Sequence, residues 1–210
     1  MRGGDPALSA RVGRSEAGRP VRRAVLLPAL VLAASLAGCG PSQPQVEIRT
    51  ELGTIRIEVD SARAPATAAN FLRYVREGRY AGATFYRVRR EAAELMQPPK
   101  GIVQGGLWYG DSTHLLPPVP FESTQRSGLR HADGTVSMAR FEDPDGARAE
   151  FFIVIGGEQP HLDYRGPAKA GYAAFGRVVD GMDVVRAIQR LPATGERLRT
   201  PVLFRAEMVR

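Results

Sequence analysis

The chain has 210 residues and a net charge of +7, and Cys39 is its only cysteine. Residues 1–39 hold six arginines against Asp5 and Glu16, so most of the excess positive charge lies in this first segment. The basic residues that follow are scattered, whereas a nucleic-acid-binding face needs them clustered. One cysteine excludes an internal disulfide, so a packed core must hold the fold, and about 170 residues suffice for a single domain.

Residues 20–40 have the pattern of an export signal. Arg22 and Arg23 precede an apolar run at 24–36, and small residues then lead to Cys39. A basic flank, a short apolar segment and small residues at a processing site are typical of a secretory signal peptide. The run of about 13 residues is too short to span a membrane, which needs roughly 20.

The residues Leu36-Ala37-Gly38-Cys39 resemble the lipobox of bacterial lipoproteins. The resemblance implies cleavage before Cys39, lipidation of this residue and a membrane anchor; a buried helix with a core cysteine is the alternative. The expected parts are a signal peptide at residues 1–38, a lipidated tether at 39–45 and a folded domain at 46–210. Gly40 provides no aspartate retention signal, so in a cell with two membranes we favour the outer membrane, facing the periplasm, over the inner one.

The folded domain begins with a predicted hairpin and a helix. Residues 46–50 and 54–59 alternate apolar and polar side chains with period two, which predicts two strands joined at Leu52-Gly53. Pro65 suits the first turn of a helix, because its missing N–H costs nothing there. Apolar residues then recur at helical spacing until Gly78, which predicts the end of this helix.

The rest of the chain predicts short strands and one more helix. Apolar or alternating runs predict strands at residues 84–88, 102–104, 135–139, 151–155, 173–179 and 202–209. We expect Asp180 to cap the second predicted helix, which carries apolar residues up to Leu191. Residues 89–100 are predicted as an irregular insertion and 108–134 as a long loop. Many short strands, two helices and no βαβ alternation predict a β-barrel or sandwich.

Ten short segments, taken together and in this order, resemble the cyclophilin-type peptidyl-prolyl isomerases. They are Leu52-Gly53, 65–71, 84–88, Gln104-Gly105-Gly106, Phe121-Glu122, 134–139, 150–153, His161-Leu162-Asp163, 175–178 and 181–185. The resemblance implies an all-β fold, a closed eight-stranded antiparallel barrel capped by two α-helices, with the substrate groove on its outside.

The reaction that the resemblance implies is cis–trans isomerisation of X-Pro peptide bonds, whose barrier is about 18–20 kcal/mol. No bond is made or broken, so no metal or cofactor is expected. A donor aimed at the prolyl nitrogen is a poor partner for the planar amide and a good one for the twisted amide, so it lowers the barrier. The resemblance assigns this role to Arg87, because arginine stays charged and presents rigid donors. An ordinary surface arginine on a strand is the alternative.

The resemblance also implies the residues that bind the substrate. They are Ile102, Gln104, Ala139, Glu150, Phe152, His161, Leu162 and Tyr172. Phe152 matches the aromatic wall of the proline pocket, and Ile102 and Leu162 match its aliphatic lining; ordinary barrel core is the alternative for these three. Ala139 matches a small position in the groove, and Tyr172 matches a position at the pocket rim.

Glu150 departs from the family pattern, in which most members have a glutamine at this position. An ionised carboxylate only accepts hydrogen bonds, whereas an amide also donates. We therefore expect Glu150 to accept a substrate N–H or to pair with Arg87 or Arg140. On this basis Glu150→Gln keeps at least wild-type turnover.

Two further departures concern the pocket. His161 replaces the tryptophan with which many members bind cyclosporin, so weak binding of that drug is expected. The segment between Arg87 and Gln104 is longer than usual, and the second pocket aromatic is missing from it. Trp108 and Tyr109 are both candidates to fill the pocket floor.

Other classes of protein fit the sequence less well. A serine hydrolase needs a serine, a histidine and an acid together at an exposed turn, but Ser137 lies in an apolar run. A metal site needs clustered ligands, and His114, His131 and His161 are scattered. Two alternatives remain: a module of the same fold that binds X-Pro segments with little turnover, and a purely structural lipoprotein.

The sequence thus predicts an exported, lipid-anchored isomerase that works as a monomer. Its expected partners are X-Pro segments of unfolded or partly folded envelope proteins and the membrane that holds the anchor, with no nucleic acid. Newly exported chains fold in that compartment, where slow X-Pro isomerisation can limit folding.

Overall fold

The computed structural model describes residues 43–91 and 100–209, and residues 40–210 form one compact unit. The expected signal peptide, Cys39 and most of the expected insertion at 89–100 lie outside the described residues. Among the helices in the described part, none is long and apolar enough to cross a membrane.

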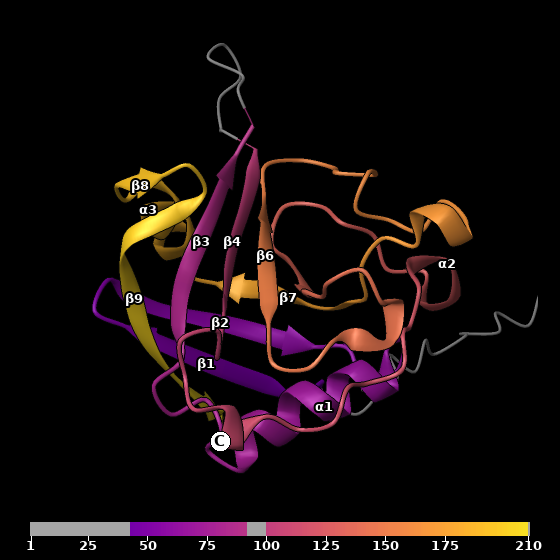
Figure 1. The fold of residues 1–210 in the computed structure, drawn as a ribbon, viewed down its shortest axis with the longest axis horizontal. Helices are drawn as coiled ribbons and strands as arrows, with labels where there is room; N and C mark the ends of the chain where they lie inside the picture. The colour runs from indigo at the N-terminus through magenta and orange to yellow at the C-terminus, as the bar shows by residue number, and fades with distance from the viewer. Residues whose placement is uncertain (1–42, 92–99, 210) are drawn as a thin grey trace, which may run out of the picture. The chain divides into compact units, whose positions relative to one another are not determined.

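Eight antiparallel strands form a closed barrel, as the family resemblance implies (Figure 1). They are β1 Gln45–Thr50, β2 Gly53–Val59, β3 Thr84–Arg90, β4 Gly101–Gly106, β5 Thr135–Met138, β6 Phe151–Ile155, β7 Ala174–Asp180 and β9 Arg197–Met208. Neighbours follow the order β1-β2-β7-β5-β6-β4-β3-β9, and β1 pairs with β9 to close the barrel. A two-residue strand, β8 Ala193–Thr194, pairs with the start of β9.

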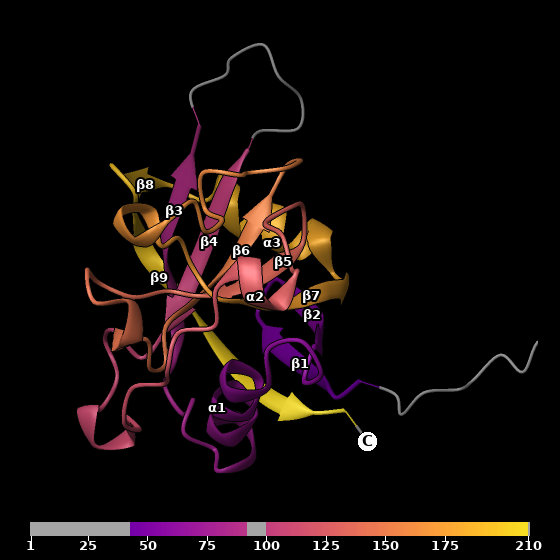
Figure 2. The ribbon, with the colours of Figure 1, turned by 90° about the vertical axis from the view of Figure 1, so that its right-hand side faces the viewer.

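Two helices lie at the predicted places in the chain, α1 at Pro65–Arg76 and α3 at Met182–Arg190. Helix α1 packs against β7 and β9, and α3 packs against β2, β3 and β4. Figures 1 and 2 show α1 below the barrel and α3 toward its upper part. The prediction of two capping helices is therefore confirmed for these elements. The expectation that Asp180 caps the second helix is wrong, because Asp180 ends β7 and the N-cap of α3 is Gly181, which provides no side-chain hydrogen bond.

The segment 108–134, predicted as a loop, contains a third helix of a single turn, α2 at Thr124–Ser127. Ser123 caps it with its side chain, and Gly128 ends it in a left-handed conformation with φ of +70°. Short 3-10 turns lie at Ser112–His114, Pro144–Gly146 and Pro167–Lys169. These turns are too short to produce a period in the sequence, so pattern reasoning does not find them.

The N-terminus of α1 is capped from a distant part of the chain. Pro65 occupies its first turn, and Ala64 before it has no side chain that can cap the helix. Instead, the carboxylate of Glu122 accepts hydrogen bonds from the N–H of Ala66 at 3.1 Å and of Thr67 at 2.8 Å. The first N–H groups of a helix lack partners and carry partial positive charge, so a carboxylate is favourable there.

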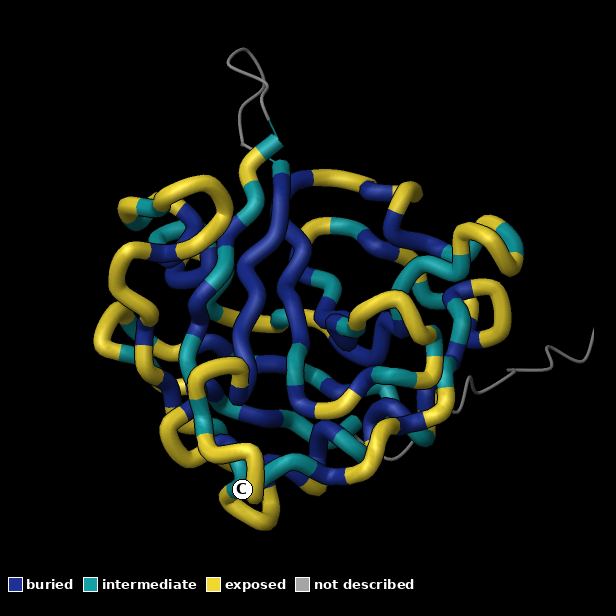
Figure 3. Tube along the Cα trace, viewed as in Figure 1, coloured by how far each residue is buried: buried dark blue, intermediate teal, exposed yellow. Residues whose placement is uncertain are grey.

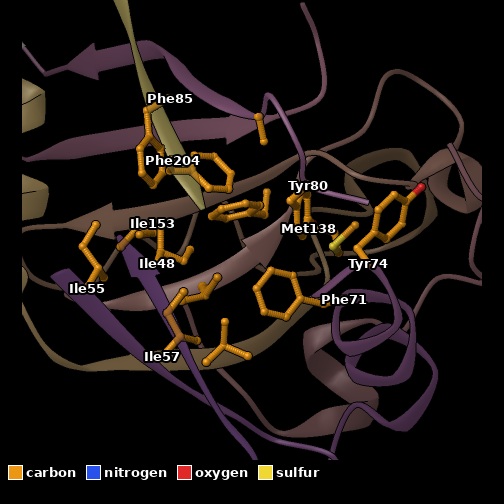
Figure 4. Close-up of a cluster of buried hydrophobic side chains, with 14 of the residues drawn as sticks. Ile48, Ile55, Ile57, Phe71, Tyr74, Tyr80, Phe85, Met138, Ile153 and Phe204 are labelled. Atoms are coloured by element: carbon orange, nitrogen blue, oxygen red, sulfur yellow. The ribbon is translucent and has the colours of Figure 1, made fainter. Parts of the chain in front are cut away.

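Strand β6 is buried on both faces, which explains why its sequence is apolar throughout (Figure 3). Ile153 faces the main core inside the barrel, together with aromatic side chains of α1, β3 and β9 (Figure 4). The alternate residues Phe152 and Val154 face outward and form a second cluster with Ile102 and Leu162. This outer cluster, and not the barrel interior, is the apolar surface on which the site is built.

Candidate active site

A pocket of about 540 Å³ opens on the outside of the barrel, over β3, β4 and β6. This volume lies within the roughly 300–1,000 Å³ of ordinary ligand pockets. Eight of the nine residues with a predicted catalytic or substrate-binding role line it, namely Arg87, Ile102, Gln104, Ala139, Glu150, Phe152, Leu162 and Tyr172. The fold brings these distant positions together, while their contacts with a substrate stay a prediction.

One end of the pocket is apolar. Phe152 packs with Ile102, Ala139 and Leu162, and its ring meets that of Tyr172 edge to face at a centroid distance of 5.2 Å. An aromatic wall with aliphatic sides can hold a pyrrolidine ring by burying apolar surface, without a hydrogen bond.

The other end carries the guanidinium of Arg87. Its Nη1 donates to Oε1 of Gln104 at 2.7 Å, and its Nε donates to Oε2 of Glu196 at 2.7 Å. Glu196 lies in the turn between β8 and β9, and no pattern in the sequence indicates that it faces the site. The side chain of Arg87 is 41% exposed, so the ion pair orients it more than it stabilises the fold.

A β-bulge explains how Tyr86 and Arg87 both reach the pocket. Consecutive residues of a regular strand point to opposite faces. The pairing of β3 with β4 and with β9 shifts register between Phe85 and Arg87. A bulge of this kind inserts an extra residue, so Phe85 fills the barrel core while the next two side chains line the pocket.

The expectation that Glu150 pairs with Arg87 or Arg140 is wrong. Its Oε2 accepts the hydroxyl hydrogen of Tyr86 at 2.6 Å, and its Oε1 accepts the N–H of Leu107 at 2.7 Å. Both oxygens of the carboxylate are thus used within the protein. Burial raises the pKa of Glu150 above its ordinary value, and the hydrogen bonds from Tyr86 and Leu107 oppose this rise.

Comparisons with known proteins identify the family of the chain. The family described as Cyclophilin type peptidyl-prolyl cis-trans isomerase/CLD matches residues 45–206. The chain belongs to this family. A peptidyl-prolyl cis-trans isomerase of Streptomyces antibioticus is 39% identical over 146 residues, which are 69% of this chain and 82% of that protein. One of Acinetobacter baylyi is 34% identical over 173 residues, 82% of this chain and 84% of that protein.

Solved cyclophilin structures share the fold. A cyclophilin type peptidyl-prolyl cis-trans isomerase of Cryptosporidium parvum superposes with a TM-score of 0.62 at 20% identity, over 80% of this chain and 98% of that one. A cyclophilin of Hirschia baltica superposes with a TM-score of 0.60 at 22% identity, over 81% of this chain and 75% of that one. The predicted family, fold class and enzyme class are therefore confirmed.

A buried polar cluster supports the aromatic wall of this cyclophilin. The ring of His131 stacks on Phe152 at 5.9 Å, with its Nδ1 2.6 Å from Oδ1 of Asp163 and its Nε2 2.9 Å from Oγ of Ser137. Burial lowers the pKa of His131 against the opposing effect of Asp163. Because a carboxylate only accepts, Nδ1–H of His131 donates to Asp163. Ser137 is fully buried, so the three residues form a brace and not an exposed nucleophile.

His161, the ninth predicted residue, does not line the pocket. Its Nε2 lies 2.9 Å from Nη2 of Arg89, which does line it. Of the two candidates for the pocket floor, Trp108 lines the pocket and Tyr109 does not. Trp108 lines the rim, 46% exposed and stacked on Tyr86, and Tyr109 is 50% exposed.

Several pocket residues were not predicted from the sequence, namely Tyr86, Leu107, Phe141, Arg148 and Arg197. Arg140, expected only as a possible partner of Glu150, also lines the pocket. Its guanidinium lies 5.3 Å from the ring centroid of Tyr172 and donates to the carbonyl oxygen of Gly171 at 2.7 Å. Arg140 therefore holds the rim in place. Within residues 43–91 and 100–209, no three His, Cys, Asp or Glu side chains gather as a metal site.

Proposed function

We propose that this cyclophilin isomerises X-Pro bonds by stabilising the twisted amide with Arg87. The observation that carries this proposal is the position of the Arg87 guanidinium, held by Gln104 and Glu196 at the edge of the apolar pocket around Phe152. A proline ring seated against Phe152 would place its nitrogen on the side of Arg87.

The hydrogen bonds of Arg87 leave donors for the substrate. A guanidinium has five N–H groups, and three of them are used by Glu196 and Gln104. The remaining two can point to the prolyl nitrogen, whose lone pair becomes an acceptor only when the amide twists. This interaction is therefore stronger in the transition state than in the ground state, as catalysis requires.

Arg87→Ala tests this role. We expect kcat for cis–trans exchange of a short X-Pro peptide, measured by NMR on residues 40–210, to fall about 100-fold, as when other transition-state donors are removed. The peptide Kd should change much less. Arg177→Ala is the matched control, because Arg177 is an exposed arginine that pairs with Glu58 outside the pocket.

The same experiment separates the enzyme from a binding module. Peptide binding without exchange, in the wild type as in the variant, would favour the module. Exchange that is equal in Arg87→Ala and wild type would leave the isomerase without an arginine mechanism.

We further propose that the domain is exported, anchored by a lipid on Cys39 and acts on unfolded envelope proteins. The support is the lipobox-like sequence before Cys39 and the compact unit at residues 40–210 that follows it. The expected division into a signal peptide at 1–38, a tether at 39–45 and a domain at 46–210 remains part of this proposal.

A further inference from the structure

A continuous series of hydrogen bonds links Glu150 to Arg87. The hydroxyl of Tyr86 donates to Oε2 of Glu150 at 2.6 Å and accepts from Nε2 of Gln104 at 2.7 Å. Oε1 of Gln104 in turn accepts from Nη1 of Arg87 at 2.7 Å. We call these four residues the relay.

The chemistry of its two ends fixes the direction of the relay. An ionised carboxylate only accepts and a guanidinium only donates. Tyr86 has one hydroxyl hydrogen, which it donates in the hydrogen bond to Glu150. The oxygen of Tyr86 must therefore accept from Gln104. The amide of Gln104 is thereby oriented with its carbonyl oxygen toward Arg87. The reverse orientation would put the NH₂ group of Gln104 against the donors of Arg87.

The carboxylate of Glu150 is itself held in place. The N–H of Leu107 donates to Oε1, while Oε2 accepts from Tyr86. The two hydrogen bonds together fix the orientation of the carboxylate. Gly106, with φ of +149°, allows this close approach, because a Cβ there would lie 2.6 Å from the carboxylate carbon and from both oxygens. The bulge in β3 then brings the Tyr86 hydroxyl to the same side as Arg87.

We propose that Tyr86 and Glu150 are positioning residues, which set the amide of Gln104 and through it the guanidinium of Arg87 for the twisted X-Pro bond. The inference rests on the proposed role of Arg87. Neither Tyr86 nor Glu150 needs to touch the reacting atoms.

The relay replaces the sequence-based expectation for Glu150→Gln. A glutamine has one accepting and one donating end, and the site needs two acceptors, for Tyr86 and for Leu107. If its NH₂ faces Tyr86, the hydroxyl donates to Gln104 instead, and the amide of Gln104 turns its NH₂ toward Arg87. If its NH₂ faces Leu107, two donors oppose each other. Either arrangement disturbs the relay, so turnover should fall.

The test compares Tyr86→Phe, Glu150→Gln and the double variant on one X-Pro peptide, with kcat, KM and thermal unfolding measured for each. We expect each single change to lower kcat about tenfold or more, the range that misplacement of a catalytic group produces, with KM nearly unchanged. The double variant should be no slower than the slower single variant, because both changes break the same series.

The matched control is Tyr109→Phe. It removes the same hydroxyl from a neighbouring, half-exposed tyrosine that does not line the pocket, so kcat should stay at the wild-type value. Tyr86→Phe keeps the aromatic ring that stacks on Trp108, so any loss of turnover in this variant reports the missing hydroxyl.

Wild-type kcat in Tyr86→Phe and Glu150→Gln, with an active wild-type enzyme, would overturn the relay. So would losses that multiply in the double variant. An inactive wild-type protein would instead refute the proposed function. If Tyr86→Phe does not fold, Glu150→Gln tests the relay alone, because this change barely alters side-chain volume. A lower kcat with an unchanged KM would support the relay, and a wild-type kcat would overturn it.

Discussion

At Glu150, the proposed role of the side chain conflicts with the stability of the fold. Its carboxylate is largely buried, and burial raises its pKa because the charged form loses hydration. The relay nevertheless needs the ionised form, which accepts at both oxygens. An active-site group that is costly to the fold is a common compromise in enzymes.

This conflict predicts a pH dependence of stability. Since the folded-state pKa of Glu150 lies above the unfolded value, its contribution to stability is most favourable when the group is protonated. That contribution is lost as the pH rises from the ordinary range of glutamate through the raised pKa. Glu150→Gln should therefore gain Tm relative to wild type as the pH rises from 4 toward 8, on the order of a few degrees at most.

Thermal unfolding of both proteins across this pH range is the measurement. Glu51→Gln, at an exposed position in the turn between β1 and β2, should show no such trend. A difference in Tm that stays constant or reverses with pH would show that burial of the charge does not set the stability here.

Some residues of the site can be identified from sequence motifs, whereas others depend on strand pairing or tertiary contacts. Arg87 and Phe152 stand in short motifs, so the family resemblance is enough to identify them. Tyr86 is adjacent to Arg87, but the bulge that brings it to the same side is a feature of strand pairing and has no sequence pattern. The brace joins His131, Ser137 and Asp163 from three segments of the chain, so no local sequence pattern groups them.

Among the elements, α1 depends on a residue far from it in sequence. From the sequence, the pair Phe121-Glu122 was recognised only as a family motif. In the structure, Glu122 caps the first turn of α1. Periodicity placed the helix correctly, whereas its cap follows from tertiary structure alone. The same distinction holds for β6, whose apolar run predicted a buried strand and not which of its faces forms the pocket.

Glu122→Ala should therefore destabilise the domain. The change leaves the N–H groups of Ala66 and Thr67 without their acceptor, at a cost of about 1–3 kcal/mol. For a domain of this size we expect Tm to fall by roughly 2–4 °C per kcal/mol. Thermal unfolding at pH 7 measures it, with the exposed Glu51→Ala as control. Equal Tm values for the two variants would mean that Glu122 does not stabilise α1.

For the whole molecule, the property to test is the proposed lipid anchor on the membrane. If Cys39 is lipidated, the full-length chain expressed in bacteria with labelled palmitate should carry the label and sediment with membranes. Cys39→Ala should lose both, whereas Ser42→Ala, three positions further along, should keep them. An unlabelled wild type, or a Cys39→Ala variant that stays with the membranes, would contradict the proposed anchor.

The pairing of β1 with β9 has a consequence for a protein proposed to work among unfolded chains. An open sheet offers unpaired N–H and C=O groups along its outer strands, and extended segments of other proteins can add to them. In the described barrel each of the eight strands has a neighbour on both sides. If the domain binds client chains at prolines as proposed, a bound client meets no free edge on these eight strands along which a sheet could grow; of the described strands, only the two-residue β8 has a neighbour on a single side.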